Sequence, residues 1–300
     1  MTTALLLVAL AIALFVGGAA IYVLGTYALA HRHAPRGLGG ALRDAGRELF
    51  WTVAIQPLLP LFYLYGRRMG TRIGGPEVEG RRPVVLVHGY GQNRVDFLRI
   101  ARTLRRRGFA RLFGFNYPWV LSVEDNATRL GRFVAEVCAE EKVEQIDIVC
   151  HSMGGLVAMK YLLGEEGSRR VARCVSIATP FRGVSWKGPM FGRSSNDLRA
   201  GYAFKEGPAP TTTRLLSIYS QHDNVVHPAT TSSLIERGGR DLDAGTMGHL
   251  AILFDPAVAN AVADFLEEPD PPEHAETPVC EVKAAAEVVP AEAAETAATS

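Results

Sequence analysis

Charged residues are absent from the first 30 positions of this 300-residue chain. The uncharged run Ala4–Ala30 is longer than the roughly 20 apolar residues that a helix needs to span a bilayer. A cleaved signal peptide is the alternative, but it would begin with basic residues and have a shorter apolar core. Here the chain starts with the uncharged residues Met-Thr-Thr. We therefore expect residues 1–30 to form a single-pass transmembrane helix that places the protein at a membrane.

Cysteine is scarce, and the overall charge is nearly balanced. The four cysteines show neither metal-ligand spacing nor a paired framework. The formal net charge is +1, so nothing in the composition points to nucleic acid as a partner, and we expect no metal and no cofactor. The charge is uneven, because residues 31–82 hold nine Arg against four acidic residues, whereas residues 267–300 hold nine acidic residues against one Lys. This asymmetry is typical of a basic membrane-proximal part and an acidic solvated tail.

Residues 31–81 are interpreted as a basic and apolar membrane-proximal linker. Its first arginines favour the cytoplasmic side of a membrane by the positive-inside rule. A second apolar stretch follows at residues 50–66, and it could lie in the interface, pack on the next domain or cross the membrane back. The last two alternatives give opposite topologies, so the side of the membrane stays open at this point.

Beyond Arg82 the pattern changes to apolar strands that alternate with helices. The expected strands are 83–88, 110–115, 145–150, 173–178 and 215–219, and the expected helices are 94–107, 124–141, 153–163 and 255–266. Continuous apolar strands separated by helices predict an α/β fold, with a mostly parallel central sheet covered by helices on both faces. The basic helix 94–107 has either a solvated face or a surface for anionic headgroups.

This predicted domain spans residues 82–267. Within it, the polar stretch 180–213 contains no clear strand and is too long for an ordinary connection, so it is a candidate cap over a site. The final segment, 268–300, is rich in Ala, Glu and Pro and weak in large apolar residues. We expect it to be a disordered acidic tail.

Ser152 stands where a predicted strand meets a predicted helix, in the sequence Cys-His-Ser-Met-Gly-Gly. On such a sharp turn the serine side chain is held above the carboxyl edge of the sheet, and the helix N-terminus favours an oxyanion. The usual pattern is G-x-S-x-G, and Cys150 replaces its first glycine, so the Cβ atom of Cys150 must fit the turn. A serine that only caps a helix is the alternative.

The loop His88-Gly89-Tyr90-Gly91 directly follows the first predicted strand. The corresponding loop of such folds lends one backbone N–H to an oxyanion hole. The N–H of Tyr90 is the candidate, with the N–H of Met153 as its partner. A simple Gly-rich turn is the alternative, and we expect His88 to orient the loop.

An acid and a base are expected beyond the serine. Asp223 follows the last predicted strand, although it could be a turn residue, and Asp197 is a rival that no strand precedes. His249 precedes the final helix, and the rival His227 lies four residues beyond Asp223. The order Ser152, Asp223, His249 is the order that this kind of fold requires.

Together these features resemble the α/β-hydrolase serine esterases and lipases, especially small bacterial triacylglycerol lipases whose elbow reads A-H-S-M-G-G. The matching stretches within residues 82–267 are PVVLVHGYG, VEQIDIVCHSMGGLVAMKYL, VARCVSIATPFRG, LLSIYSQHDNVVHP and MGHLAILFDPAV. The resemblance implies an α/β-hydrolase fold with Ser152 as nucleophile, Asp223 and His249 as its partners, and the two backbone N–H groups as the oxyanion hole.

The activity to expect is hydrolysis of a carboxylic ester through a Ser-His-Asp triad and an acyl-enzyme. A lipid or other acyl ester is the first choice of substrate, because the anchor would place the site near lipid. Three apolar residues of the stretch 180–213, Trp186, Met190 and Phe191, would supply contact with an acyl chain. A thioesterase or amidase would use the same triad, and a non-catalytic membrane-bound binding protein is the alternative from another class.

Overall fold

The computed structural model describes residues 2–60, 78–185, 190–199 and 212–270. The chain forms two compact units, Met1–Glu267 and Glu268–Ser300. The second unit contains the expected acidic tail, and from residue 271 onward it lies outside the described residues. The fold and the site described below belong to the first unit.

A six-stranded sheet forms the centre of the first unit, with all strands parallel and in the order β2-β1-β3-β4-β5-β6. The strands are β1 (Val84–Val87), β2 (Leu112–Phe115), β3 (Ile146–His151), β4 (Val171–Ile177), β5 (Arg214–Tyr219) and β6 (Arg240–Asp243). Every residue of β1 to β4 is buried, as their largely apolar sequences predict. The predicted parallel α/β sheet is confirmed.

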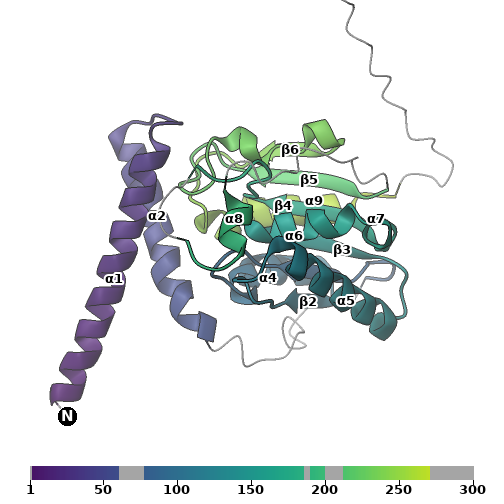
Figure 1. Ribbon diagram of the computed structural model, residues 1–300, viewed down its shortest axis with the longest axis horizontal. Helices are drawn as coiled ribbons and strands as arrows, with labels where there is room; N and C mark the ends of the chain where they lie inside the picture. Colours follow the sequence, from purple (N-terminus) through teal and green to yellow (C-terminus); the bar gives the residue numbers. More distant parts are fainter. Residues whose placement is uncertain (1, 61–77, 186–189, 200–211, 271–300) are drawn as a thin grey trace, which may run out of the picture. The chain divides into compact units, whose positions relative to one another are not determined.

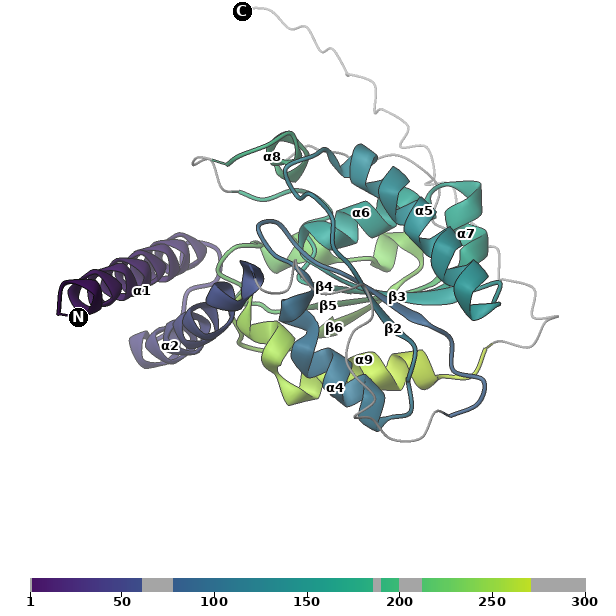
Figure 2. The same cartoon turned by 90° about the horizontal axis from the view of Figure 1, so that it is seen from below.

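Helices cover both faces of the sheet (Figures 1 and 2). One face carries α5 (Val123–Glu141), α6 (Met153–Leu162) and α7 (Glu165–Arg170), and the other carries α4 (Leu98–Arg106) and α9 (Pro256–Glu267). Each layer has its own apolar core against the sheet. The predicted basic helix 94–107 begins as a 3-10 turn at Arg94–Phe97. Its last arginine, Arg107, pairs with Asp264 and Glu267 of α9.

The order of the strands creates a crevice at their carboxyl ends. From β1 the chain moves outward to β2, returns to β3 on the other side of β1, and continues to β4. The loops after β1 and β3 therefore leave neighbouring strands in opposite directions, which is where ligands bind in open α/β sheets. Val87 and Cys150 are paired at the ends of these two strands, so the loops that contain Tyr90 and Ser152 start side by side.

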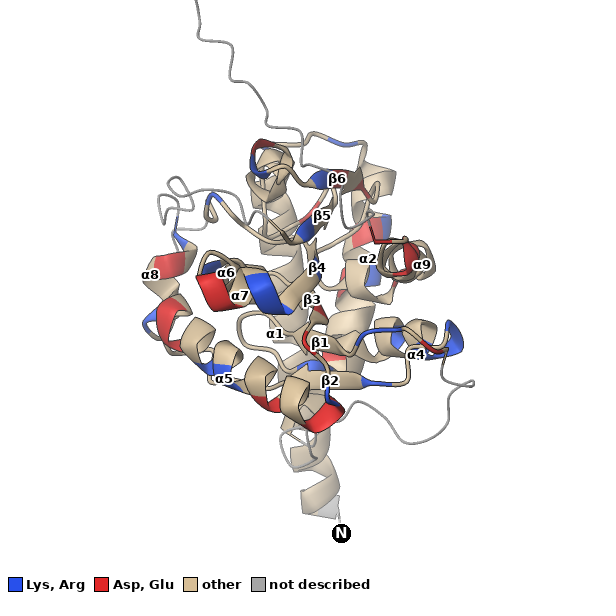
Figure 3. Ribbon diagram, turned by 90° about the vertical axis from the view of Figure 1, so that its right-hand side faces the viewer, with Lys and Arg blue, Asp and Glu red and all other residues tan. Residues whose placement is uncertain are grey.

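Two further helices precede the sheet. The first, α1 (Thr2–Ala30), carries no charged residue (Figure 3). An 18-residue window within its segment Thr3–Ala30 has a mean hydropathy of 2.7. Among the described residues, this is the one helix long and apolar enough to cross a membrane. The second, α2 (Leu38–Ile55), lies beside α1.

The helix α2 falls within the stretch interpreted from the sequence as a linker. The ring of Trp51 in α2 stacks on the ring of Phe254, with the ring centroids 4.1 Å apart. For the start of the apolar stretch 50–66, packing on the following domain is therefore the arrangement observed, while residues 61–66 lie outside the described residues. The buried polar residues of α2 are Asp44, which pairs with Arg36, and Glu48. Because these inward positions are acidic, the buried face of α2 is not the apolar stripe from which a packed helix is predicted.

Two short elements of the sheet domain were also not predicted from the sequence. The strand β6 reads Arg-Asp-Leu-Asp and lies at the edge of the sheet, where only one of its four side chains is apolar. The helix α7 reads Glu-Glu-Gly-Ser-Arg-Arg and has no apolar side chain. Neither has the apolar periodicity from which strands and helices are predicted.

Candidate active site

Ser152 occupies a strained turn between β3 and α6. Its backbone has φ +51° and ψ −126°, a conformation that costs a residue with a side chain on the order of 1–3 kcal/mol. The turn is closely packed, because a Cβ atom at Gly154 would collide with the carbonyl oxygens of Val87 and His88. Only glycine fits at this position, two residues after the serine. The predicted sharp strand-to-helix turn is present around Ser152.

The first position of the turn accommodates a cysteine. Cys150 is fully buried in β3, and its Sγ lies 3.3 Å from the carbonyl oxygen of Val175 and 4.0 Å from Sγ of Cys174. Its side chain packs within the core on the α5 and α6 side of the sheet. The side chain that makes Cys150 an unusual residue here is therefore accommodated in the buried core.

A chain of hydrogen bonds joins the three side chains that the sequence singled out. His249 Nε2 lies 2.9 Å from Ser152 Oγ, and His249 Nδ1 lies 2.9 Å from Asp223 Oδ2. The second carboxylate oxygen of Asp223 accepts hydrogen bonds from the N–H groups of Val225 and Val226, each at 2.8 Å. These bonds hold the carboxylate at the carboxyl end of β5, facing the imidazole.

Two opposing effects act on the proton affinity of His249. Burial by itself lowers the pKa of this histidine, because the charged form loses its hydration. The charge and hydrogen bond of Asp223, together with the charge of Glu48, oppose this effect, and the net pKa lies above its usual value. The ring is therefore basic enough to accept a proton from a neighbouring hydroxyl.

Neither rival residue occupies this position. Asp197 lies on the short helix α8 (Ser194–Leu198), where its Oδ2 accepts a hydrogen bond from Val123 N at 2.7 Å and so caps α5. His227 faces the same cavity as Ser152, but its ring stacks on His33 at 4.7 Å. Burial, and then the proximity of His33, lowers the pKa of His227. Within the described residues, its ring has no hydrogen bond to Ser152.

The two candidate oxyanion donors border the serine. Met153 is the first residue of α6, a position whose N–H has no partner within the helix. Tyr90 lies in the loop after β1, where its hydroxyl donates to the carbonyl oxygen of Phe191 at 2.8 Å and accepts from Phe191 N at 2.7 Å. Its ring also contacts Trp119 edge-on, at 4.6 Å between centroids. Tyr90 therefore fixes its loop against residues of the stretch 180–213.

A cavity of about 1200 Å³ opens beside Ser152 and His249. Of the three apolar residues that we expected from the sequence to line it, Met190 does so. Phe191 is 72% exposed, and Trp186 lies outside the described residues. The lining also includes residues from α1 and α2 that precede the sheet domain in the sequence.

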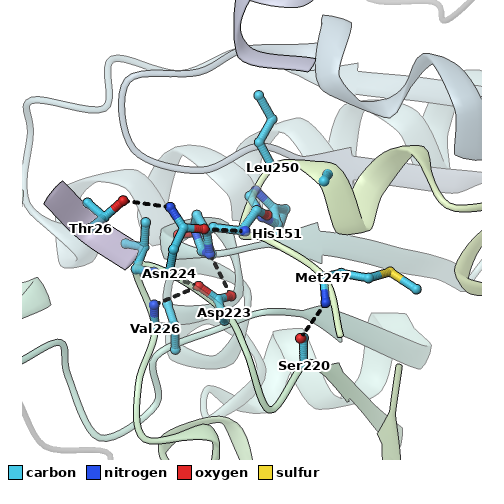
Figure 4. A network of polar contacts seen from close by, with 12 residues as sticks. Thr26, His151, Ser220, Asp223, Asn224, Val226, Met247 and Leu250 are labelled. Carbon is cyan, nitrogen blue, oxygen red and sulfur yellow. Dashed lines mark hydrogen bonds and ion pairs between the residues drawn. The ribbon is translucent and has the colours of Figure 1, made fainter. Parts of the chain in front are cut away.

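A second set of residues supports the loop that holds His249, and no pattern in the sequence predicts this role for them. Asn224 Oδ1 accepts the N–H of His249 at 2.8 Å, and Asn224 Nδ2 donates to Thr26 Oγ1 of α1 at 2.8 Å (Figure 4). His151 Nε2 lies 3.0 Å from the carbonyl oxygen of His249. In the sequence, Asn224 stands next to Asp223 and His151 stands next to Ser152, and this adjacency is their one signal. Thr26 has no such signal.

Glu48 of α2 completes this support. Its carboxylate accepts hydrogen bonds from Leu250 N, at 2.9 and 3.1 Å to its two oxygens, and from Ala251 N at 2.8 Å. The side chain is buried, and burial raises its pKa to about 7. Glu48 thus caps the 3-10 helix Ala251–Phe254 directly after His249. Nothing in the sequence links it to a loop 202 residues away.

Comparison with known proteins identifies the family of this chain and agrees with its fold. Residues 84–295 match the family model described as the alpha/beta hydrolase family. Among solved structures, the mature lipase BlEst2 of Bacillus licheniformis superposes with a TM-score of 0.57 at 16% identity, over 66% of this chain and 96% of that one. Lipase B of Aspergillus fumigatus superposes with a TM-score of 0.55 at 17% identity, over 68% of this chain and 56% of that one.

A third similar structure is an esterase of Exiguobacterium antarcticum, with a TM-score of 0.50 at 18% identity, over 65% of this chain and 94% of that one. At these identities the likeness establishes the fold. The family model covers more than half of the sequence, and the predicted α/β-hydrolase fold is confirmed. The chain belongs to the alpha/beta hydrolase family.

Proposed function

We propose that this protein is a membrane-anchored serine hydrolase that cleaves carboxylic esters, with lipid or other acyl esters as its substrates. The observation that carries the proposal is the hydrogen-bonded chain from Asp223 through His249 to Ser152, beside a cavity with a largely apolar lining. Membership of the alpha/beta hydrolase family, and the lipases and esterases among the similar structures, support the same class of reaction.

In the proposed mechanism, His249 Nε2 takes the proton of the Ser152 hydroxyl as Oγ attacks the ester carbonyl carbon. Asp223 accepts a hydrogen bond from Nδ1–H, which leaves Nε2 free to act as the base and stabilises the imidazolium that forms. The tetrahedral intermediate collapses when the bond to the alcohol oxygen breaks and His249 returns the proton to that oxygen. The acyl group remains on Ser152 until water, deprotonated by His249, releases it as the carboxylic acid.

The backbone N–H groups of Tyr90 and Met153 are the proposed donors to the oxyanion. Such donors act mainly in the transition state, and losing one costs roughly 3 kcal/mol in activation free energy. The N–H of Met153 lies at the N-terminus of α6, where the helix dipole adds positive potential that favours an oxyanion. The hydrogen bonds between Tyr90 and Phe191 support this assignment, because they hold the loop that would present the other donor.

The proposed anchor is α1, retained in the mature protein. The hydrogen bond between Thr26 and Asn224 supports retention, since a cleaved signal peptide would leave Asn224 without this partner. Alkaline carbonate extraction of membranes from expressing cells tests the anchor. We expect the full-length protein, with the N-terminal peptide detected by mass spectrometry, to stay in the pellet. A shortened protein in the supernatant would contradict the proposal. A topology reporter fused after Glu267 then identifies the side of the membrane.

The nucleophile is tested with a fluorophosphonate probe. We expect the wild type to be labelled and to hydrolyse short p-nitrophenyl esters, and Ser152→Ala to do neither. Ser168→Ala, at a serine of α7, the helix that follows α6 in the chain, is the matched control and should behave as wild type. Labelling that persists in Ser152→Ala would refute the assignment of the nucleophile. A wild type that shows neither labelling nor hydrolysis would instead favour a binding protein.

A further inference from the structure

The cavity beside Ser152 has a wall made by the helix that precedes the family's matched region. Seven residues of α1 line it, at positions 14, 15, 18, 19, 22, 26 and 29. These spacings of three and four place the residues along one face of the helix. The family match begins at residue 84, so this wall is an addition to the hydrolase domain.

The wall extends far along α1. From residue 14 to residue 29 the helix rises by about 22 Å at 1.5 Å per residue. Leu14, Phe15, Gly18 and Ala19 lie near the middle of the apolar segment Thr3–Ala30. If that segment crosses a membrane, as proposed above, these residues lie at the depth of the hydrocarbon core. The cavity therefore continues from the hydrolase domain to the level of the lipid acyl chains.

The other end of the wall, the C-terminal part of α1, lies level with Ser152 and His249. Thr26 Oγ1 accepts a hydrogen bond from Asn224 Nδ2, and Asn224 Oδ1 accepts the N–H of His249, each at 2.8 Å (Figure 4). Two hydrogen bonds thus connect α1 to the backbone of His249. The cavity runs from Ser152 and His249 at this level to Leu14 and Phe15 further along the helix.

Along α1 and the loop that follows it, the lining changes in polarity in the same direction, while α2 contributes Glu48, Thr52 and Gln56. Beyond the apolar part of α1, the residues that face the cavity include Arg32, His33 and His227. One cavity therefore offers an apolar wall on the side of the membrane segment and polar side chains past the end of α1. This gradient matches an amphiphile whose chain lies along the helix and whose polar part lies near its end.

We propose that α1 is a wall of the substrate site as well as an anchor, and that the substrate is a membrane lipid ester. Its acyl chain lies along the face of α1 from Leu14 to Tyr22 while its carbonyl carbon reaches Ser152. The chain then moves from the bilayer into the cavity without crossing water, so its apolar surface stays covered throughout. This proposal rests on the proposed ester hydrolysis and adds the substrate's source and the residues that select for chain length.

Two neighbouring glycines of α1 allow a matched test. Gly18 lines the cavity and Gly17 does not. Apart from the nearby backbone of α1 itself, a Cβ atom at either glycine would meet no atom of the described residues within 4 Å. The variants Gly18→Phe and Gly17→Phe therefore add the same side chain one residue apart. The full-length proteins are reconstituted in phosphatidylcholine vesicles and assayed with p-nitrophenyl acetate and p-nitrophenyl palmitate.

We expect Gly18→Phe to lower kcat/KM for the palmitate ester by about tenfold or more, a typical penalty for a pocket that no longer fits its substrate. Its activity on the acetate ester and its labelling by a small fluorophosphonate should stay at the wild-type level, which reports an intact reaction centre. Gly17→Phe should match the wild type on both esters.

Other results separate the two proposals. Equal activity of Gly18→Phe and the wild type on both esters, with wild-type hydrolysis intact, overturns the α1 wall and leaves ester hydrolysis standing. An equal loss on both esters also overturns it, because the loss would not depend on the acyl chain. A wild type that hydrolyses neither ester and is not labelled contradicts the proposed function itself.

Discussion

Glu48 accepts a hydrogen bond from the backbone N–H of Leu250, the residue that follows His249, at 2.9 Å. The same carboxylate also accepts the N–H of Ala251. A residue of α2 therefore holds the backbone of the loop that presents the proposed base, and its charge acts on the imidazole. The helices that precede the sheet are thus connected to the site both by hydrogen bonds and by charge.

The charge of Glu48 predicts a shift in the pH profile. His249 must be neutral to act as a base, so kcat/KM rises with pH as the histidine loses its proton. Burial lowers the pKa of His249, but Asp223 and, to a smaller extent, Glu48 raise it above its usual value. Glu48→Gln removes one of these charges, and the acidic limb of the profile should move to lower pH.

The pH dependence of kcat/KM for p-nitrophenyl acetate measures this shift. Glu124→Gln, which removes an exposed acid at the start of α5, is the control and should keep the wild-type profile. His151 also contacts the loop, but burial lowers its pKa well below the usual value, so it stays neutral. A Glu48→Gln profile that coincides with the wild type would exclude an electrostatic role.

Glu48 also predicts how stability changes with pH. Burial raises its pKa from 4.5 to about 7 in the folded protein. Between these values the folded state binds more protons than the unfolded state, so stability falls as pH rises from 4.5 to about 7 and then levels off. At roughly 1.4 kcal/mol per pKa unit the full effect is about 3 kcal/mol.

The variant Glu48→Gln has no titratable proton at this position, so its stability lacks this pH dependence. Thermal unfolding in detergent should therefore show the melting temperature of the wild type falling by several degrees relative to the variant between pH 5 and pH 7.5. A difference in melting temperature that stays constant over this range would contradict the raised pKa.

The bond between α1 and Asn224 predicts a loss of stability on removal of one hydroxyl. Thr26→Val keeps the shape of the side chain but leaves the buried Asn224 amide without its acceptor, which costs about 1–3 kcal/mol. Thr26→Ser keeps the acceptor and should stay near the wild type. Thermal unfolding of both variants checks this prediction. Equal stability of Thr26→Val and Thr26→Ser would count against a stabilising hydrogen bond between Thr26 and Asn224.

Asp223 and its rival can be compared by the same substitution. Asp223→Asn keeps an acceptor for Val225 and Val226 but no longer holds Nδ1 of His249 as the protonated nitrogen. We expect kcat to fall by about 10⁴-fold, as in other triads. Asp197→Asn, at the cap of α5, should leave kcat for p-nitrophenyl acetate nearly unchanged. A larger loss from Asp197→Asn would reverse the assignment.

Cys150→Gly restores the usual glycine of the elbow. Because the cysteine side chain is fully buried in β3, the glycine leaves a small cavity and a more flexible strand, at a cost of about 1–3 kcal/mol. We expect a lower melting temperature and no increase in kcat. A gain in kcat would mean that the cysteine constrains the turn.

Local patterns in the sequence were sufficient for strands β1 to β5 and for the serine turn, but not for the edge strand β6. Strands such as β1 and β2 are continuous apolar runs because both faces of a parallel sheet are covered, so their burial can be recognised without knowing their neighbours. The turn at Ser152 requires a small residue at position 154 because the backbone of β1 lies against it. These constraints act over a few residues, and therefore they appear as motifs.

The choice between His249 and His227 depended on tertiary structure. His227 is closer to Asp223 in the sequence, but hydrogen bonding depends on where the loop before α9 folds back over the end of β5. The roles of Glu48 and Thr26 are even less local, because each contacts a loop about 200 residues away. The sequence by itself determined the strands β1 to β5, the turn and the order of the three side chains. Only the folded chain decided which helices line the cavity and hold His249, because those contacts depend on long-range packing.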